Sequence, residues 1–182
     1  SPSRDFQKLT VISRMRPSSP PNVVTQEYSF KTVGSAVFTF QEGVNGYTGT
    51  FDTEVKGGSP DEDRSDFDAL NPDGSDGGGA NHVLIRFDNL FGMGPGQITP
   101  GSVIAEATLT LDIFDEGSNQ TMYRMLVPWA ESVTWNEISS DPSNPTGISA
   151  DDTTAASTAD TGFAAPLGTA VINLPPSTLQ AW

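Results

Sequence analysis

The residues best suited to chemistry lie in one acidic stretch of the chain. Residues 57–81 hold a series of aspartates, which are Asp61, Asp63, Asp66, Asp68, Asp73 and Asp76. Carboxylate oxygens are the ligands that Ca²⁺ prefers, and the spacings 61/63 and 66/68 let two carboxylates on a loop turn toward one ion. The stretch lacks the complete EF-hand pattern, so a solvated acidic loop is the alternative interpretation. The calcium ligands predicted here are Asp61, Asp63, Asp73 and Asp76.

Two of the three tryptophans stand close together in "VPWAESVTWNE", residues 127–137. A tryptophan ring offers the largest flat area on which the C–H groups of a sugar can stack. The same rings also suit the core of a β-sandwich. The core interpretation is favoured for Trp135, and both interpretations stay open for Trp129.

Two arginines, Arg86 and Arg124, carry the planar fork that binds a uronate carboxylate through two hydrogen bonds. Arg86 has apolar neighbours in a predicted strand, so an inward guanidinium would need a carboxylate, for which Asp88 and Asp112 are the alternatives. The ligand-binding residues predicted from these side-chain types are Trp129, Tyr47, Arg86 and Arg124.

Few residues suit catalysis. The chain has one histidine, His82, and it has no GxSxG, HExxH or phosphate-binding glycine-loop motif. A carboxylate pair for glycoside hydrolysis stays open, because that chemistry depends on a separation of roughly 5–10 Å that a sequence does not reveal. We predict that the chain is not an enzyme.

Net charge excludes several partners. Nine Lys and Arg residues oppose 23 Asp and Glu residues, which gives a formal net charge of −14. Such a chain repels a phosphate backbone and an anionic membrane surface, so we predict no nucleic-acid partner. No stretch approaches 18 apolar residues, so we predict no membrane insertion. A strongly anionic glycan would be repelled unless calcium bridged it, which favours neutral sugars or calcium-mediated binding.

Composition also bears on location. Cysteine is absent, which excludes disulfide and zinc-thiolate chemistry without identifying a compartment. Acidity, scarce lysine and an abundance of Thr, Ser, Asp and Gly resemble secreted bacterial surface proteins. We therefore predict a secreted, extracellular or cell-surface protein.

The elements that must position these residues are predicted strands. Apolar and polar side chains alternate within 28–40, 82–90, 103–114, 120–127 and 168–174. In 103–114 the apolar face is expected to carry Ala105, Ala107, Leu109, Leu111 and Ile113. No window shows a sustained helical stripe bounded by caps. The pattern predicts an all-β protein, an antiparallel β-sandwich of jelly-roll type with long acidic loops.

The first residues differ in charge from the rest. Residues 1–31 carry five basic and two acidic groups, which leaves −17 for the remainder. Pro20 and Pro21 forbid helix there, and Leu9 and Val11 provide only one short apolar alternation. We predict a basic Pro/Ser-rich leader or linker over residues 1–27 and one sandwich module over residues 28–182.

Several separated segments resemble the DNRLRE family, also called disaggregatase-related modules. The matching segments are "FQEGVNGYTGTFDTEV" (40–55), "HVLIRFDNL" (82–90), "ITPGSVIAEATLTLDIFDEGS" (98–118), "VPWAESVTWNEI" (127–138) and "TLQAW" (178–182). Members are secreted β-sandwich modules found beside polysaccharide lyases, glycosidases and metallophosphoesterases, and they are often described as carbohydrate-binding. The resemblance implies such a fold, and it implies function less directly.

The resemblance also implies a second calcium site. The chain departs from the family in two respects. Sandwich carbohydrate-binding modules can hold a structural calcium near the first matched strand, which implies the ligands Glu42, Asp52 and Glu54. The acidic stretch at 57–81 is longer than in the family. The family's last strands, which follow the "TLQAW" segment, are absent, so the C-terminus is expected to be incomplete.

Two hypotheses of different classes follow. The first is a non-catalytic extracellular module that binds carbohydrate and targets or anchors a larger protein to polysaccharide, with structural calcium. The second is a structural or adhesive surface or filament subunit. In that case copies would self-associate by strand exchange through the N-terminal segment or the open C-terminal sheet edge.

Overall fold

The computed structural model of the chain describes residues 7–14, 35–67, 69–74, 79–139, 141 and 146–180. It contains eight strands and two short helices within these residues: β1 (Gln7–Arg14), β2 (Ser35–Phe40), β3 (Thr50–Lys56), β4 (Asn81–Phe87), β5 (Val103–Ile113), β6 (Gln120–Met122), α1 (Trp135–Ile138), β7 (Thr161–Phe163), β8 (Gly168–Leu174) and α2 (Pro176–Gln180). Every pair of neighbouring strands is antiparallel. The all-β prediction is confirmed.

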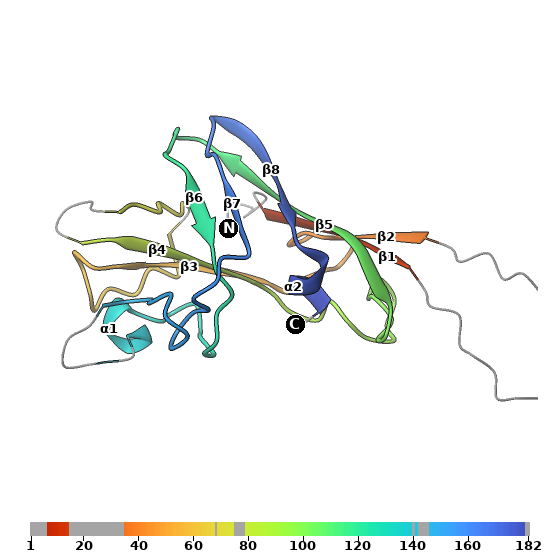
Figure 1. The fold of residues 1–182 in the computed structure, drawn as a ribbon, viewed down its shortest axis with the longest axis horizontal. Helices are drawn as coiled ribbons and strands as arrows, with labels where there is room; N and C mark the ends of the chain where they lie inside the picture. The colour runs from red at the N-terminus through yellow and green to blue at the C-terminus, as the bar shows by residue number, and fades with distance from the viewer. Residues whose placement is uncertain are drawn as a thin grey trace, which may run out of the picture.

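The largest sheet has four strands in the order β2-β1-β5-β8 (Figure 1). Burial along β8 alternates strictly, with Ala170, Ile172 and Leu174 buried and Val171 exposed. This is the period-2 pattern of a strand with one face on the core, and it confirms the predicted strand at 168–174. Helix α2 follows directly and lies beside β5 in Figure 1.

Strand β5 departs from the expected inward face at one position. The pairing with β1 shifts register between Ile12 and Ser13, so that Ile12 lies opposite Glu106 and Ser13 opposite Ile104. One extra residue is therefore accommodated in β5, as in a β-bulge. Ile104 becomes buried, while Ala105, which the alternation placed on the core face, is only half-buried.

Strand β1 lies in the segment that the sequence assigned to a leader or linker. It pairs with β2 on one side and with β5 on the other, so Gln7–Arg14 belongs to the sheet. Its register places Leu9 opposite Leu109 and Phe40, two of the most buried residues. The short alternation of Leu9 and Val11 was therefore a strand signal. The expected strand around Tyr28 and Phe30 lies outside the described residues.

The second sheet consists of β3 and β4. Because the side chains of a strand alternate between faces, Ile85 and Phe87 join one cluster while Leu84 joins another. Strand β4 therefore contributes side chains to a core on each of its two faces. Figure 1 shows β3 and β4 running side by side from the four-stranded sheet toward α1.

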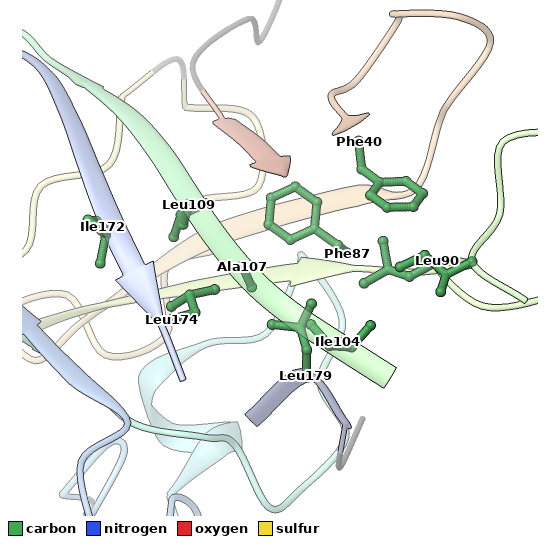
Figure 2. Packing of buried hydrophobic residues seen from close by; sticks show 10 residues of the cluster. Phe40, Phe87, Leu90, Ile104, Ala107, Leu109, Ile172, Leu174 and Leu179 are labelled. Carbon is green, nitrogen blue, oxygen red and sulfur yellow. The ribbon is translucent and has the colours of Figure 1, made fainter. Parts of the chain in front are cut away.

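The main core lies between the four-stranded sheet and the end of β4. It contains ten buried side chains: Phe40, Phe87, Leu90, Ile98, Ile104, Ala107, Leu109, Ile172, Leu174 and Leu179. Figure 2 shows Ala107 and Leu109 of β5 and Leu174 of β8 on the side of their strands that faces Phe87, with Leu179 of α2 near Ile104. Burial of apolar area at roughly 25 cal/mol per Å² drives this packing.

A smaller core covers the other face of β3 and β4. Val55 and Leu84 pack there with Trp135 and Ile138 of α1. The helix begins at a capping box, in which the Thr134 hydroxyl accepts from the Glu137 N–H and the Glu137 carboxylate accepts from the Thr134 N–H. Trp135 is therefore a core residue, as the sequence favoured. Among the described helices, neither is long and apolar enough to cross a membrane.

Candidate functional site

A polar concavity lies beside Arg124, and we call it the Arg124 groove. Its volume is about 320 Å³, and its lining is Arg124, Asp152, Ala156, Thr158, Asp160, Ser177 and Thr178. These residues come from the segment after β6, the long connection before β7, and α2. One guanidinium, two carboxylates and three hydroxyls therefore converge from segments far apart in the sequence.

Local turn geometry fixes Asp152 at this groove. Its backbone is left-handed, with φ of 66°, a conformation that Asp and Asn adopt more readily than most residues. Its carboxylate accepts hydrogen bonds from the Ser157 N–H (2.8 Å) and the Ser157 hydroxyl (2.7 Å). These two bonds favour the charged form and hold the pKa of Asp152 below its usual value.

The opposite wall is tied to α2. The Thr178 hydroxyl donates to the Asp160 carboxylate at 2.8 Å, and the Asp160 N–H donates to the Met122 carbonyl at 2.9 Å. The Arg124 carbonyl accepts from the Ala156 N–H at 2.9 Å, which fixes the backbone from which the Arg124 side chain projects. The walls are thus set before any ligand arrives, a condition that lowers the entropic cost of binding.

A second depression, of about 360 Å³, runs along β6 and β7. It is lined by Asn119, Gln120, Thr121, Gly162, Phe163 and Ala164. None of these six residues is charged, because the lining consists only of amide, hydroxyl and apolar groups. Hydrogen bonds to charged groups are roughly twice as strong as neutral ones, so the Arg124 groove is the better equipped of the two.

Arg86 and Trp129, both predicted to bind ligand, contact each other instead. The Arg86 guanidinium lies 4.8 Å from the centroid of the Trp129 ring and 4.6 Å from that of Phe51. It donates to the Trp129 carbonyl at 2.6 Å and pairs with Asp88 at 2.9 Å. The expected pairing of Arg86 with a carboxylate is therefore present, with Asp88 as the partner.

This arrangement leaves Trp129 poorly placed as a sugar platform. Its ring is half-buried, it packs against the α1 core, and Arg86 lies against it. Cation–π contact and packing both fix the ring, so a structural role accounts for its position. Ligand binding by Trp129 and Arg86 stays a prediction.

Tyr47 is likewise held by its neighbours. Its ring packs edge-on against Phe40 at 5.2 Å, and its hydroxyl donates to the Asp88 carbonyl at 2.8 Å. Burial and the nearby carboxylates raise the pKa of Tyr47 well above its usual value. Position 49, close to Tyr47, has no room for a side chain, because a Cβ on Gly49 would lie 2.6 Å from the Asp88 carbonyl oxygen. Tyr47 thus stabilises the turn between β2 and β3.

The carboxylates of the second predicted calcium set, Glu42, Asp52 and Glu54, are engaged separately. Glu42 accepts from the Thr50 N–H at 3.0 Å. Glu54, only 1% exposed, pairs with Arg64 at 2.8 Å and accepts from the Asn71 N–H at 2.6 Å. Asp52 is buried, and its N–H donates to Glu131 at 3.2 Å. Arg64 already balances the charge of Glu54, and calcium binding by these three groups stays a prediction.

The aspartates of the acidic stretch are also dispersed. Asp61 accepts from the Asn136 side chain at 2.7 Å, and Asp63 accepts from the Ser65 N–H at 3.0 Å, which holds the pKa of Asp63 below its usual value. Asp73 forms a backbone bridge with Asn81. Asp76 lies outside the described residues. In the part of the chain that the structure describes, no group of three or more His, Cys, Asp or Glu residues could hold a metal ion.

The groove contains residues that the sequence did not single out. Asp152, Asp160 and Thr178 stand in polar stretches that differ little from other Thr- and Asp-rich segments of this chain. The only local signal was the Asp151-Asp152 step followed by Ser157, which suits side-chain capping of a turn. Their convergence on Arg124 depends on tertiary pairing of β6 with β7.

None of the protein-family models, curated proteins or solved structures compared with this chain matches it.

Proposed function

We propose that the chain is a non-catalytic carbohydrate-binding module that acts outside the cell or at its surface and targets or anchors a larger protein to polysaccharide. The Arg124 groove is its recognition site. The observation that carries the proposal is the convergence of Arg124, Asp152 and Asp160 on one preorganised concavity. The resemblance to the DNRLRE family stays a prediction and agrees with this assignment.

The groove chemistry suits a polyhydroxylated ligand. Carboxylates accept hydrogen bonds from sugar hydroxyls, a guanidinium donates to hydroxyl and ring oxygens, and Thr and Ser hydroxyls do either. Such charge-assisted bonds are worth about 1.5–3 kcal/mol each when they replace neutral contacts. Ala156 adds an apolar contact for the C–H groups of a sugar ring.

Charge favours a neutral glycan. The groove carries two carboxylates against one guanidinium, and the whole chain has a formal charge of −14. An anionic polysaccharide would therefore meet repulsion at long range and at the site. Neutral hexose or pentose polymers avoid this cost.

The hydrogen bonds that Asp152 and Asp160 accept support ligand binding without catalysis. A glycosidase needs one carboxylic acid with a raised pKa as its proton donor. The pKa of Asp152 is lowered by Ser157, and Asp160 already accepts from the Thr178 hydroxyl. The lowered pKa makes Asp152 a poor proton donor near neutral pH.

The proposal includes a more specific assignment of the fold, as a β-sandwich of jelly-roll type. We assign the four-stranded sheet and the β3–β4 sheet to the two layers of a jelly-roll β-sandwich, because the main core packs between them. Binding sites of such scaffolds commonly lie on loops held by a rigid framework. The Arg124 groove is built from such connections.

Binding to a panel of polysaccharides tests the proposal. Wild-type protein is run through native gels containing cellulose derivatives, xylan, β-glucan, mannan or alginate, and retarded bands are followed by calorimetry. We expect retardation by at least one neutral glycan. Arg124→Met should weaken that binding about 10–100-fold, the loss expected for one charged hydrogen bond. Asp160→Asn should act in the same direction while its amide oxygen still accepts from Thr178.

Two controls separate the groove from other surfaces. Asp112→Asn removes one negative charge, as Asp160→Asn does, but from an exposed position of β5. It should leave glycan binding unchanged. Trp129→Phe keeps an aromatic ring in the smaller core; if it weakens binding more than Arg124→Met does, the site lies at Trp129. Absence of binding to every glycan tested contradicts the proposed function.

A further inference from the structure

Strand β1 joins two parts of the largest sheet. All eight of its residues pair with β5, and Leu9–Arg14 also pair with β2. Among the described strands, β2 has no other neighbour in its sheet. The attachment of β2 to β5 therefore depends on β1 lying between them, as the red and orange strands beside β5 show in Figure 1.

The connection from β1 to β2 is far longer than the pairing requires. Arg14 lies directly opposite Ser35, so the adjoining ends of the two strands are neighbours. A hairpin of two to five residues would join such ends. The chain instead places residues 15–34 between them, including Pro17, Pro20 and Pro21. A stretch of this length spans up to about 66–72 Å when extended, enough to reach an adjacent molecule.

Charge favours an encounter between β1 and the rest of another copy. Residues 1–31 carry five basic and two acidic groups, whereas the remainder has a net charge of −17. Opposite charge raises the rate of association. The same contrast also attracts β1 to the sheet of its own molecule. Charge therefore favours pairing of β1 both within one molecule and between two molecules, and it does not decide between them.

We propose that β1 is exchanged between copies of this chain, so that β1 of one molecule lies between β2 and β5 of a second copy. The contacts within each sheet are then the same as in the monomer, and only the connection changes. Reciprocal exchange closes as a two-fold dimer, while exchange in one direction gives a longer assembly. Because β1 is joined to its own sheet by a connection of limited length, its effective concentration there is of the order of millimolar, so exchange grows as the protein concentration approaches that value. This inference does not rest on carbohydrate binding.

Cysteine cross-linking tests the exchange, because the chain has no cysteine of its own. Thr10 is paired with Thr108 in the register of β1 and β5. Chains carrying only Thr10→Cys are mixed with chains carrying only Thr108→Cys, from ~10 µM to ~1 mM, unfolded and refolded together, and oxidised. Exchange brings the two cysteines within the Cα separation of a disulfide. We expect a disulfide-linked dimer of the two chains on non-reducing gels, with a yield that rises with concentration.

Two controls make the result specific. Asn173 is paired with Thr108 on the far side, two strands from β1, so Thr10→Cys and Asn173→Cys chains should not cross-link in register. The Thr10→Cys/Thr108→Cys chain, oxidised when dilute, should form an internal disulfide that shows β1 in its sheet. A variant with residues 15–34 replaced by Asn-Gly should remain monomeric in light scattering.

The inference is overturned by either of two results. One is an internal disulfide in the double variant with no heterodimer up to ~1 mM. The other is equal cross-linking of the Thr10→Cys chain to Thr108→Cys and to Asn173→Cys chains, which indicates random collision.

Discussion

At the scale of single residues, His82 shows how burial alone can set a pH dependence. Its Nδ1 accepts from the Ile148 N–H at 3.3 Å, and its ring lies 5.0 Å from that of Trp135. Burial disfavours the imidazolium and lowers the pKa of His82 in the folded protein. The neutral ring is therefore the form that the folded state accommodates.

We expect the folded state to lose stability as the pH falls through and below about 6.5, the usual pKa of histidine in an unfolded chain. Below that value the unfolded chain binds a proton that the folded chain resists, so the free energy of unfolding decreases until the folded pKa is passed. One proton limits the slope to about 1.4 kcal/mol per pH unit, and partial exposure keeps the change smaller. Urea unfolding at pH 7.5, 6.5 and 5.5 measures it.

His82→Gln is the matched variant, because its amide oxygen can still accept from Ile148 and does not titrate in this range. Its stability should change less than that of the wild type between pH 7.5 and 5.5. Equal slopes in the two proteins would assign the pH dependence to other groups.

The ion pair of Glu54 and Arg64 is the residue-scale contact that holds the acidic stretch on β3. Arg64 also pairs with Glu62 at 2.9 Å, and its guanidinium lies 3.7 Å from the centroid of the Phe67 ring. The sequence offered a solvated acidic loop as one interpretation of this stretch. Arg64 is instead held against the buried Glu54 of β3, a partner that the local sequence could not reveal.

Arg64→Met should destabilise the protein by about 3–5 kcal/mol, because it leaves a buried carboxylate without its counter-ion. Glu54→Gln/Arg64→Met should recover much of that loss, since an amide oxygen still accepts from the Asn71 N–H and no charge stays buried. Chemical denaturation of the single and double variants gives both values. A double variant as unstable as the single one would show that packing of the Arg64 stem, rather than charge, is what matters.

At the scale of elements, β2 is an edge strand in the part of the chain that the structure describes, and it carries no charged side chain. Ser35, Ala36, Val37 and Thr39 are exposed, Val37 to 65%, and the strand carries no charge. An uncharged edge strand offers unpaired N–H and C=O groups to another molecule. By contrast, Glu42 and Glu131 accept hydrogen bonds from the N–H groups of Thr50 and Asp52 in β3.

Val37→Lys should reduce concentration-dependent aggregation while changing the free energy of unfolding by less than about 0.5 kcal/mol, because the side chain already faces solvent. Light scattering during storage and thermal unfolding measure the two effects. Val37→Thr serves as the uncharged control and should protect less. Because the lysine blocks edge pairing and leaves β1 untouched, β1 exchange should persist in Val37→Lys.

Whether a strand or helix could be predicted from the sequence depended on its length and on the residues that flank it. Strands β4, β5 and β8 carry alternations long enough to be recognised, and each was expected close to its observed position. Strand β1 was missed because its eight residues stand among proline- and serine-rich segments with a different charge. Helix α1 has only four residues, too few for a helical period, and its capping box Thr134–Glu137 was the one available signal.

At the scale of the whole molecule, the candidate site was less predictable than the fold. Arg124 was expected to bind ligand from its type alone, yet the groove depends on Asp152 and Asp160, which only the β6–β7 pairing and α2 bring near it. Arg86 and Trp129 were also chosen by type, and they contact each other. Residue types therefore indicated the chemistry, while sheet pairing decided which of these residues line a concavity.

Net charge is the whole-molecule property with the clearest thermodynamic consequence. With 23 acidic residues against nine basic ones, we expect electrostatic repulsion in the compact state to oppose folding. Raising NaCl from ~10 mM to ~150 mM shortens the screening length from about 30 Å to about 8 Å. We expect the midpoint of thermal unfolding to rise by roughly 2–4 °C, which corresponds to about 1 kcal/mol for a chain of this size.

Calcium chloride at matched ionic strength distinguishes screening from site binding. If the acidic stretch including Asp76 assembles a calcium site, CaCl₂ should raise the midpoint beyond the NaCl value, and EDTA should reverse only the excess. MgCl₂ is the control, because Mg²⁺ demands a tighter octahedral site than flexible loop carboxylates provide. Equal midpoints in the three salts would leave screening as the whole effect and contradict the calcium prediction. A fall in the midpoint with NaCl would show that attractive pairs such as Glu54–Arg64 outweigh the net repulsion.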